Sequence, residues 1–153
     1  MAKIFKNEKE LERFLLPKLQ AAVTRTQEQI YQILHRFVKE FYNDFTPEMY
    51  ERTYQLFQSL VKSRIILTGH GYEAEVYFDL GSLYYTTGNK PYGHEVMDAA
   101  KQGLHGAIGD RFLFKTGEIG VNIWNDPKQI IDAEAIRMLE RELIAEGIPV
   151  KKG

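Results

Sequence analysis

The chain has 153 residues, of which 44% are hydrophobic, enough to bury the core of a single domain over residues 1–153. Its formal net charge of −1 excludes a general electrostatic attraction to nucleic acid or membranes, and the lack of cysteine excludes disulfides and thiolate chemistry. The first ten residues lack the apolar core of a signal peptide, and no apolar run approaches the ~20 residues of a membrane span. We therefore expect a protein made in a cytoplasm.

The first predicted element is a long amphipathic helix over about residues 8–44. Asn7 can cap this helix, and Glu10 completes a pattern similar to a capping box. Pro17 removes one backbone hydrogen bond from the helix interior, which predicts a kink or a break there. Apolar residues step by threes and fours along one stripe: Leu11, Phe14, Leu15, Leu19, Val23, Ile30, Leu34, Phe37, Val38 and Phe41. Such a helix is longer than a small domain covers, so its leading turns pack either on another subunit or across the chain's own sheet.

A short helix and a β-hairpin are predicted next. The dipeptide Thr46-Pro47 is typical of a helix start, and helical spacing of apolar residues continues to about Ser63. Residues 64–68 predict a strand, followed by a three-residue turn at 69–71. Residues 72–79 alternate between apolar and polar side chains, which predicts a second strand with one face toward solvent.

The next part of the chain is predicted to be richer in loops. A glycine- and tyrosine-rich loop over residues 80–93 precedes a short helix over residues 94–102. Residues 106–120 contain four glycines and are interpreted as a mobile loop. Residues 120–124 are interpreted as a third strand.

The last predicted element is a helix that begins with Asp126 as its cap and Pro127 in its first turn, and that ends at Gly147. One face of it is apolar: Ile131, Ala135, Leu139 and Leu143. The order of elements predicts an α+β fold, with the long N-terminal helix followed by a body over about residues 46–147. That body would combine the short second helix, a small and mainly antiparallel sheet with a β-hairpin, and the C-terminal helix.

The sequence contains no recognisable catalytic, metal or phosphate-binding motif. His94, Asp98 and His105 are the one cluster with some resemblance to metal ligands, but the His-x-x-x-His spacing with a nearby glutamate is missing. A polar turn is the favoured interpretation of this cluster. A metal-dependent hydrolase built on these three residues remains an alternative, although we expect no metal, no cofactor and no catalytic residue.

Other charged residues also give no indication of catalysis or of nucleic-acid binding. Glu73, Glu75 and Asp79 fall on the exposed face of the predicted hairpin, where carboxylates are usual, rather than in a cleft. A weak basic stripe around Arg36 is diluted by neighbouring acidic residues, so direct sequence-specific binding of nucleic acid is not expected.

Tyrosine is the one residue type that indicates an interaction surface. The chain has nine tyrosines, and Tyr84, Tyr85 and Tyr92 fall together in the predicted loop. Tyrosine buries a large apolar area and keeps a polar hydroxyl, which suits protein interfaces. The alternative is ordinary packing around a small sheet.

One stretch resembles a known family. The residues are Thr46-Pro47, Tyr50, Arg52-Thr53, Leu56 and Ser59-Leu60. They resemble a motif in small virion proteins of tailed bacteriophages and prophages, in the minor structural, tail-completion or head–tail joining group of long-tailed phages. The commoner form has Asp-Thr-Gly after the proline, where this chain has other residues at 51–54. In that family the motif lies between a long N-terminal helix and a β-hairpin, and a glycine-rich loop and a C-terminal helix follow.

The resemblance implies a non-enzymatic virion protein that is made in the host bacterial cytoplasm and acts in head–tail joining or tail completion. Such subunits assemble into a ring at the neck or tail end, so the implied partners are copies of the chain itself and other phage neck or tail proteins, with no membrane. The interface candidates are Tyr50, Arg52, Thr53, Tyr84, Tyr85, Tyr92 and His105. The alternative is a phage-encoded inhibitor that binds a host defence protein.

Overall fold

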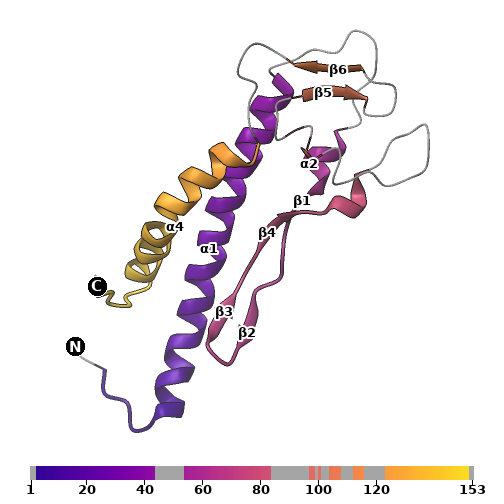
Figure 1. Ribbon diagram of the computed structural model, residues 1–153. Helices are drawn as coiled ribbons and strands as arrows, with labels where there is room; N and C mark the ends of the chain where they lie inside the picture. Colours follow the sequence, from indigo (N-terminus) through magenta and orange to yellow (C-terminus); the bar gives the residue numbers. More distant parts are fainter. Residues whose placement is uncertain are drawn as a thin grey trace.

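The computed structural model describes residues 3–43, 54–83, 97–98, 100, 104–107, 112–115 and 123–151. Its fold is α+β, as predicted, with a long N-terminal helix, a C-terminal helix and short antiparallel strands (Figure 1). The helical elements are α1 (Glu8–Asn43), α2 (Gln55–Ser59), the 3₁₀ turn η1 (Leu80–Ser82) and α4 (Asn125–Ala145). The strands are β1 (Leu60–Lys62), β2 (Ile66–Thr68), β3 (Gly71–Glu73), β4 (Val76–Phe78), β5 (Leu104–Ala107) and β6 (Phe112–Lys115).

Helix α1 has 36 residues and spans about 54 Å at ~1.5 Å per residue. The predicted cap is confirmed, because Asn7 Oδ1 accepts a hydrogen bond of 3.0 Å from the Glu10 amide. The Glu10 carboxylate accepts one of 2.8 Å from the Lys6 amide. Of the kink or break predicted at Pro17, the break is wrong, since α1 continues through the proline as one helix. The ring is exposed, and the single backbone bond that it removes is outweighed by the helical turns on either side.

Helix α4 runs antiparallel to α1 along one side of it (Figure 1). The predicted cap is wrong: Trp124 occupies the cap position and makes no side-chain capping hydrogen bond, and Asp126 lies inside the first turn, where its charge still suits the helix dipole. The predicted end at Gly147 is confirmed. Gly147 has a φ of +77°, and the amide of Ile148 donates back to the Leu143 carbonyl at 2.9 Å, which closes the helix in a Schellman motif.

The strands β1 to β4 form one long, interrupted ribbon on the other side of α1 (Figure 1). β1 pairs with β4, and β2 pairs with β3, both antiparallel. Between these pairs, residues 63–65 lie opposite residues 74–75, so one strand carries an extra residue, as in a β-bulge. The predicted hairpin is confirmed. Its turn has only two residues, because Thr68 pairs with Gly71.

The burial pattern of the second half of the ribbon also follows the prediction. The side chains of Tyr72, Ala74, Val76 and Phe78 are half-buried or buried, and those of Glu73, Glu75, Tyr77 and Asp79 are exposed. The predicted second helix, by contrast, does not reach Ser63. It ends at Ser59, and Leu60–Lys62 form β1, because pairing with β4 outweighs the helical spacing of these residues.

The C-terminal part departs most from the prediction. Residues 104–107 and 112–115 form the antiparallel pair β5–β6, so the predicted loop over 106–120 is wrong where it is described. The run Phe112-Leu113-Phe114 has high strand propensity, which the neighbouring glycines obscured. The predicted strand at 120–124 is also wrong at its described end, since residues 123–124 form a turn. Residues 97–98 and 100 are helical, in agreement with the predicted helix there.

The hydrophobic core lies around the C-terminal half of α1. Its buried members come from several elements: Leu34, Val38, Phe41, Leu56, Leu60, Phe78, Leu83, Met97, Ala100 and Ile123. Upstream of Ala22, the apolar residues of α1 are only half-buried, and Leu11 is exposed. The leading turns of α1 therefore extend beyond the core and leave apolar side chains accessible.

Candidate interaction surfaces

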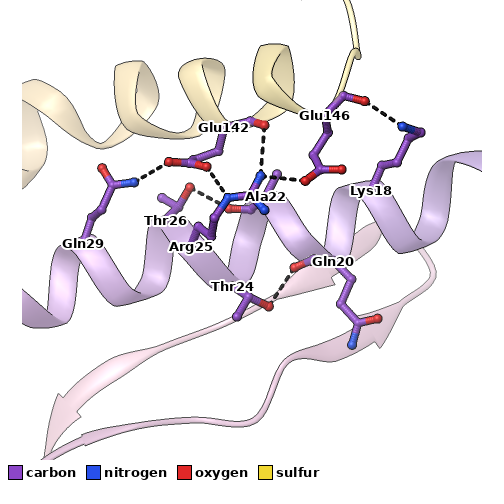
Figure 2. A network of polar contacts seen from close by, with 9 residues as sticks. All are labelled: Lys18, Gln20, Ala22, Thr24, Arg25, Thr26, Gln29, Glu142 and Glu146. Carbon is purple, nitrogen blue, oxygen red and sulfur yellow. Dashed lines mark hydrogen bonds and ion pairs between the residues drawn. The ribbon is translucent and has the colours of Figure 1, made fainter.

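A set of polar contacts joins the middle of α1 to the end of α4 (Figure 2). Arg25 lies between two glutamates: its Nε donates to Glu142, and its Nη2 donates to Glu146 Oε1 at 2.8 Å. Gln29 Nε2 donates to the other Glu142 oxygen at 2.7 Å. Lys18 Nζ donates to the backbone carbonyl of Glu146 at 2.8 Å. These contacts set the register of the two antiparallel helices.

The charges in this set reinforce one another. The hydrogen bond from Arg25 holds the pKa of Glu142 below its usual value. The same bond, with the contact to Glu146, raises the pKa of Arg25. Elsewhere on α1, Lys62 of β1 forms an ion pair with Glu28 and so attaches β1 to the helix. The hydrogen bond from Lys62 lowers the pKa of Glu28. Because surface ion pairs are individually weak, this set contributes to geometry more than to stability.

Gln27 connects α1 to the ribbon at its interruption. Its side chain is buried, with 7% exposure, and its Nε2 donates to the carbonyls of Ser63 at 3.0 Å and Glu75 at 2.8 Å. Two carbonyl acceptors fix the orientation of the amide, so the oxygen Oε1 lies on the opposite side of the group. No residue in the described part of the chain donates to that oxygen.

A groove lies beside Gln27, between α1, the ribbon and α4, and its volume is about 470 Å³. Its walls are mainly apolar and half-buried: Val23, Ile30, Tyr72, Val76 and Leu139. The buried side chain of Gln27 also lines it. Glu73 and Glu75 also line it, and both residues are exposed. Neither carboxylate forms an ion pair with a described residue. A volume of this size falls within the ~300–1,000 Å³ typical of ligand pockets.

An aromatic row crosses from α1 to α2 and consists of Tyr31, His35, Phe57, Tyr42 and Tyr54. Successive ring centroids lie 4.8–5.9 Å apart. His35 is half-buried, and its ring contacts Tyr31 on one side and Phe57 on the other. The spacing of Tyr31 and His35 on one helical face is a signal visible in the sequence, although their contact with Phe57 is not. Such half-exposed aromatic rings are typical of protein interfaces.

Several large apolar side chains are exposed on different parts of the molecule. Ile4 is 87% exposed in the segment that precedes α1. Ile66 and Leu67 are both more than half exposed at the end of the ribbon, and Ile136 and Ile144 are more than half exposed on α4. Single exposed apolar residues are common, but Ile66 and Leu67 are neighbours on one strand and expose one apolar side chain on each face of the ribbon, where either can contact another protein.

Most of the predicted interface residues lie outside the described part of the chain. These are Tyr50, Arg52, Thr53, Tyr84, Tyr85 and Tyr92. His105 lies in β5, where its backbone is opposite Phe114 of β6. The described surfaces are instead formed by residues that sequence reasoning did not single out as a site, chiefly Gln27 and the aromatic row. Gln27 interrupts the apolar stripe of α1, and that interruption is the signal that could have identified it.

The described residues contain no group of three or more His, Cys, Asp or Glu side chains that could hold a metal ion. Of the three residues considered as metal ligands, His94 lies outside the described part, and Asp98 is exposed. The Asp79 carboxylate accepts a hydrogen bond of 3.1 Å from the Gly81 amide, which caps η1. No helix in the described ranges is long and apolar enough to cross a membrane.

Comparison of the chain with protein-family models, curated proteins and solved structures gives no significant match in any of the three.

Proposed function

We propose that this chain is a non-enzymatic phage virion protein that acts in head–tail joining or tail completion by assembling into a ring at the neck or tail end. The protein would be made in the host cytoplasm and reside in the virion. Its partners would be copies of itself and other neck or tail proteins. The sequence motif from Thr46 to Leu60 supports this proposal, together with the order of helix, hairpin and C-terminal helix.

The observation that carries the proposal furthest is the distribution of exposed apolar side chains. Ile66 and Leu67 lie at the end of the ribbon, whereas Ile136 and Ile144 lie on α4, on the other side of α1 (Figure 1). Ring assembly requires two different surfaces on each subunit, because each head-to-tail contact joins one surface to another. Apolar contacts on separate elements meet this requirement.

The polar contacts of α1 support a rigid subunit. Arg25 and Gln27 fix α4 and the ribbon to the same helix, so the two sides of α1 keep a constant relative position. A ring that closes with a fixed number of subunits needs a constant angle between its two contact surfaces. Long-range hydrogen bonds between elements help to hold this angle.

The proposal is tested by the protein content of purified virions and by the mass of the purified protein in solution. We expect mass spectrometry to detect the chain in purified virions. We also expect light scattering after size exclusion to give a mass that rises with concentration. The double variant Ile66→Ser/Leu67→Ser should shift this rise to higher concentration, and Leu80→Ser, an exposed residue of η1, serves as the matched control.

Two results would contradict the proposal. The first is absence of the protein from purified virions. The second is a strict monomer that binds no portal, adaptor or tail-tube protein in a pull-down. Tight one-to-one binding to a host defence nuclease would favour the alternative function, an inhibitor of host defence.

A further inference from the structure

The groove beside Gln27 and the segment before α1 are complementary in shape and charge. We propose that the groove of one copy receives residues 3–6 of a second copy, with Ile4 inserted between its apolar walls. This inference rests on the proposed function, because it specifies one of the head-to-tail contacts between subunits. The contact would be heterologous, since the inserted segment and the groove are different surfaces of the same chain.

The segment before α1 presents Ile4 outward. The Phe5 ring lies 5.1 Å from the Phe14 ring, and Lys3 Nζ lies 4.3 Å from the centroid of the Phe14 ring. Both side chains are therefore directed toward α1, and Ile4 between them points the other way, as alternation in an extended segment requires. Its 87% exposure is the largest among the exposed large apolar residues in the described ranges. The contact of Phe5 with Phe14 fixes the segment in a position that leaves the Ile4 side chain exposed to another surface.

The charges on the two surfaces are opposite. Lys3 and Lys6 lie on either side of Ile4 in the chain; Lys3 contacts the Phe14 ring of its own chain, and Lys6 forms no ion pair with a described residue. On the groove, Glu73 and Glu75 are exposed and likewise without an ion pair in the described part of the chain. The Lys6 ammonium near an exposed isoleucine thus matches the negative charge of two glutamates among the residues that line an apolar groove. Such complementarity speeds association and selects the partner.

The groove also offers one directional contact. Gln27 uses both protons of its amide on the ribbon carbonyls, which leaves Oε1 as a buried acceptor without a described donor. An extended segment supplies backbone N–H groups at regular intervals, and one of them can donate to this oxygen. Occupation of the groove would therefore satisfy a buried polar atom as well as cover apolar surface.

The segment belongs to a different copy because it cannot reach the groove of its own chain. Phe5 is held at Phe14, whereas the groove begins at Val23, nine residues further along α1. Nine residues correspond to about 13 Å of helix at ~1.5 Å per residue. Ile4 is adjacent to the anchored Phe5, and a single residue extends only ~3.5 Å.

A peptide assay tests the contact without altering the fold. A fluorescent peptide of residues 1–9 is titrated with the full-length protein, and binding is measured by anisotropy. We expect saturable binding that weakens about tenfold or more when the peptide carries Ile4→Asp, because the apolar contact is lost. The peptide with Lys3→Glu and Lys6→Glu should also bind less tightly, and this difference should shrink as salt is raised.

Changes in the protein complete the charge test. Glu73→Lys/Glu75→Lys should weaken binding of the natural peptide and strengthen binding of the charge-reversed peptide. The control Glu12→Lys/Glu140→Lys makes the same change in net charge away from the groove and should leave both affinities within about twofold. Equal affinity of all peptides for all proteins, or no binding of the natural peptide, would overturn the inference.

A mixing experiment separates this inference from the proposed function. Full-length Ile4→Asp keeps the groove, and full-length Glu73→Lys/Glu75→Lys keeps the segment. Each alone should lose self-association through this contact, whereas an equimolar mixture should form a one-to-one pair. If the chain is found in virions but the mixture forms no pair, the inference fails and the proposed function stands. If the pair forms but the chain is absent from virions, the proposed function fails and the contact stands.

Discussion

Gln27 is the residue through which α1 holds the ribbon, and replacing it with methionine tests this directly. Gln27→Met keeps the length of the side chain but removes both hydrogen bonds, to Ser63 and Glu75. A buried acceptor left without a partner costs about 1–3 kcal/mol. Water in the adjacent groove can hydrate these carbonyls in part, so we expect the free energy of unfolding to fall by about 2–4 kcal/mol. For a chain of this size, this corresponds to a decrease in Tm of about 5–15 °C.

Urea denaturation followed by circular dichroism measures this loss, and amide hydrogen exchange locates it. Exchange should accelerate in residues 60–78 more than at the start of α1. Gln32→Met is the matched control, because Gln32 donates only to the exposed Glu28 carboxylate, and its change should cost less than about 0.5 kcal/mol. Gln27→Glu should recover stability as the pH falls, since only the protonated acid can donate to a carbonyl. A stability of Gln27→Met within about 0.5 kcal/mol of the wild type would refute the reasoning.

Three further predictions concern the core, the contact between Arg25 and Glu142, and the end of α4. Leu83→Ala should lower the free energy of unfolding by about 2–5 kcal/mol because Leu83 is fully buried, whereas Leu80→Ala, at a residue 40% exposed, should cost less than about 1 kcal/mol; urea denaturation compares them. The pKa of Glu142 is lowered in the fold, so its stabilisation is present above the usual value of 4.5 and is lost as the pH falls through the lower folded value. Glu142→Gln should therefore reduce the loss of stability between pH 7 and pH 3, and an unchanged pH dependence would contradict this. Gly147→Ala should lower the free energy of unfolding by about 1 kcal/mol because of the φ of +77°, and an unchanged Tm would show that this helix end does not limit stability.

The elements that were predictable from the sequence are those fixed by neighbouring residues. The cap at Asn7 and the end at Gly147 depend on side chains within one turn, and both are as predicted. The alternation in residues 72–79 depends on a period of two, and the burial pattern follows it. Local chemistry suffices in each of these cases.

The elements that were not predictable depend on residues far apart in the chain. Leu60–Lys62 have helical spacing, yet they form β1 because β4 supplies a partner strand. The candidate groove needs Gln27, Glu75 and Leu139 together, from three elements separated by dozens of residues. A polar residue within an apolar stripe indicates that a polar partner lies opposite it, but not which carbonyls accept its hydrogen bonds.

The groove exists because polar contacts, rather than apolar ones alone, position the elements around α1. Arg25 holds α4 on one side, and Gln27 holds the ribbon on the other, each through atoms at fixed hydrogen-bond distances. Leu139 of α4 and Tyr72 of the ribbon both line the groove, so its walls come from the two elements that these polar contacts attach to α1. The residue that stabilises the ribbon is thus also part of the wall that would receive a second copy. Loss of Gln27 should therefore weaken the binding of the residue 1–9 peptide even under conditions where the variant remains folded.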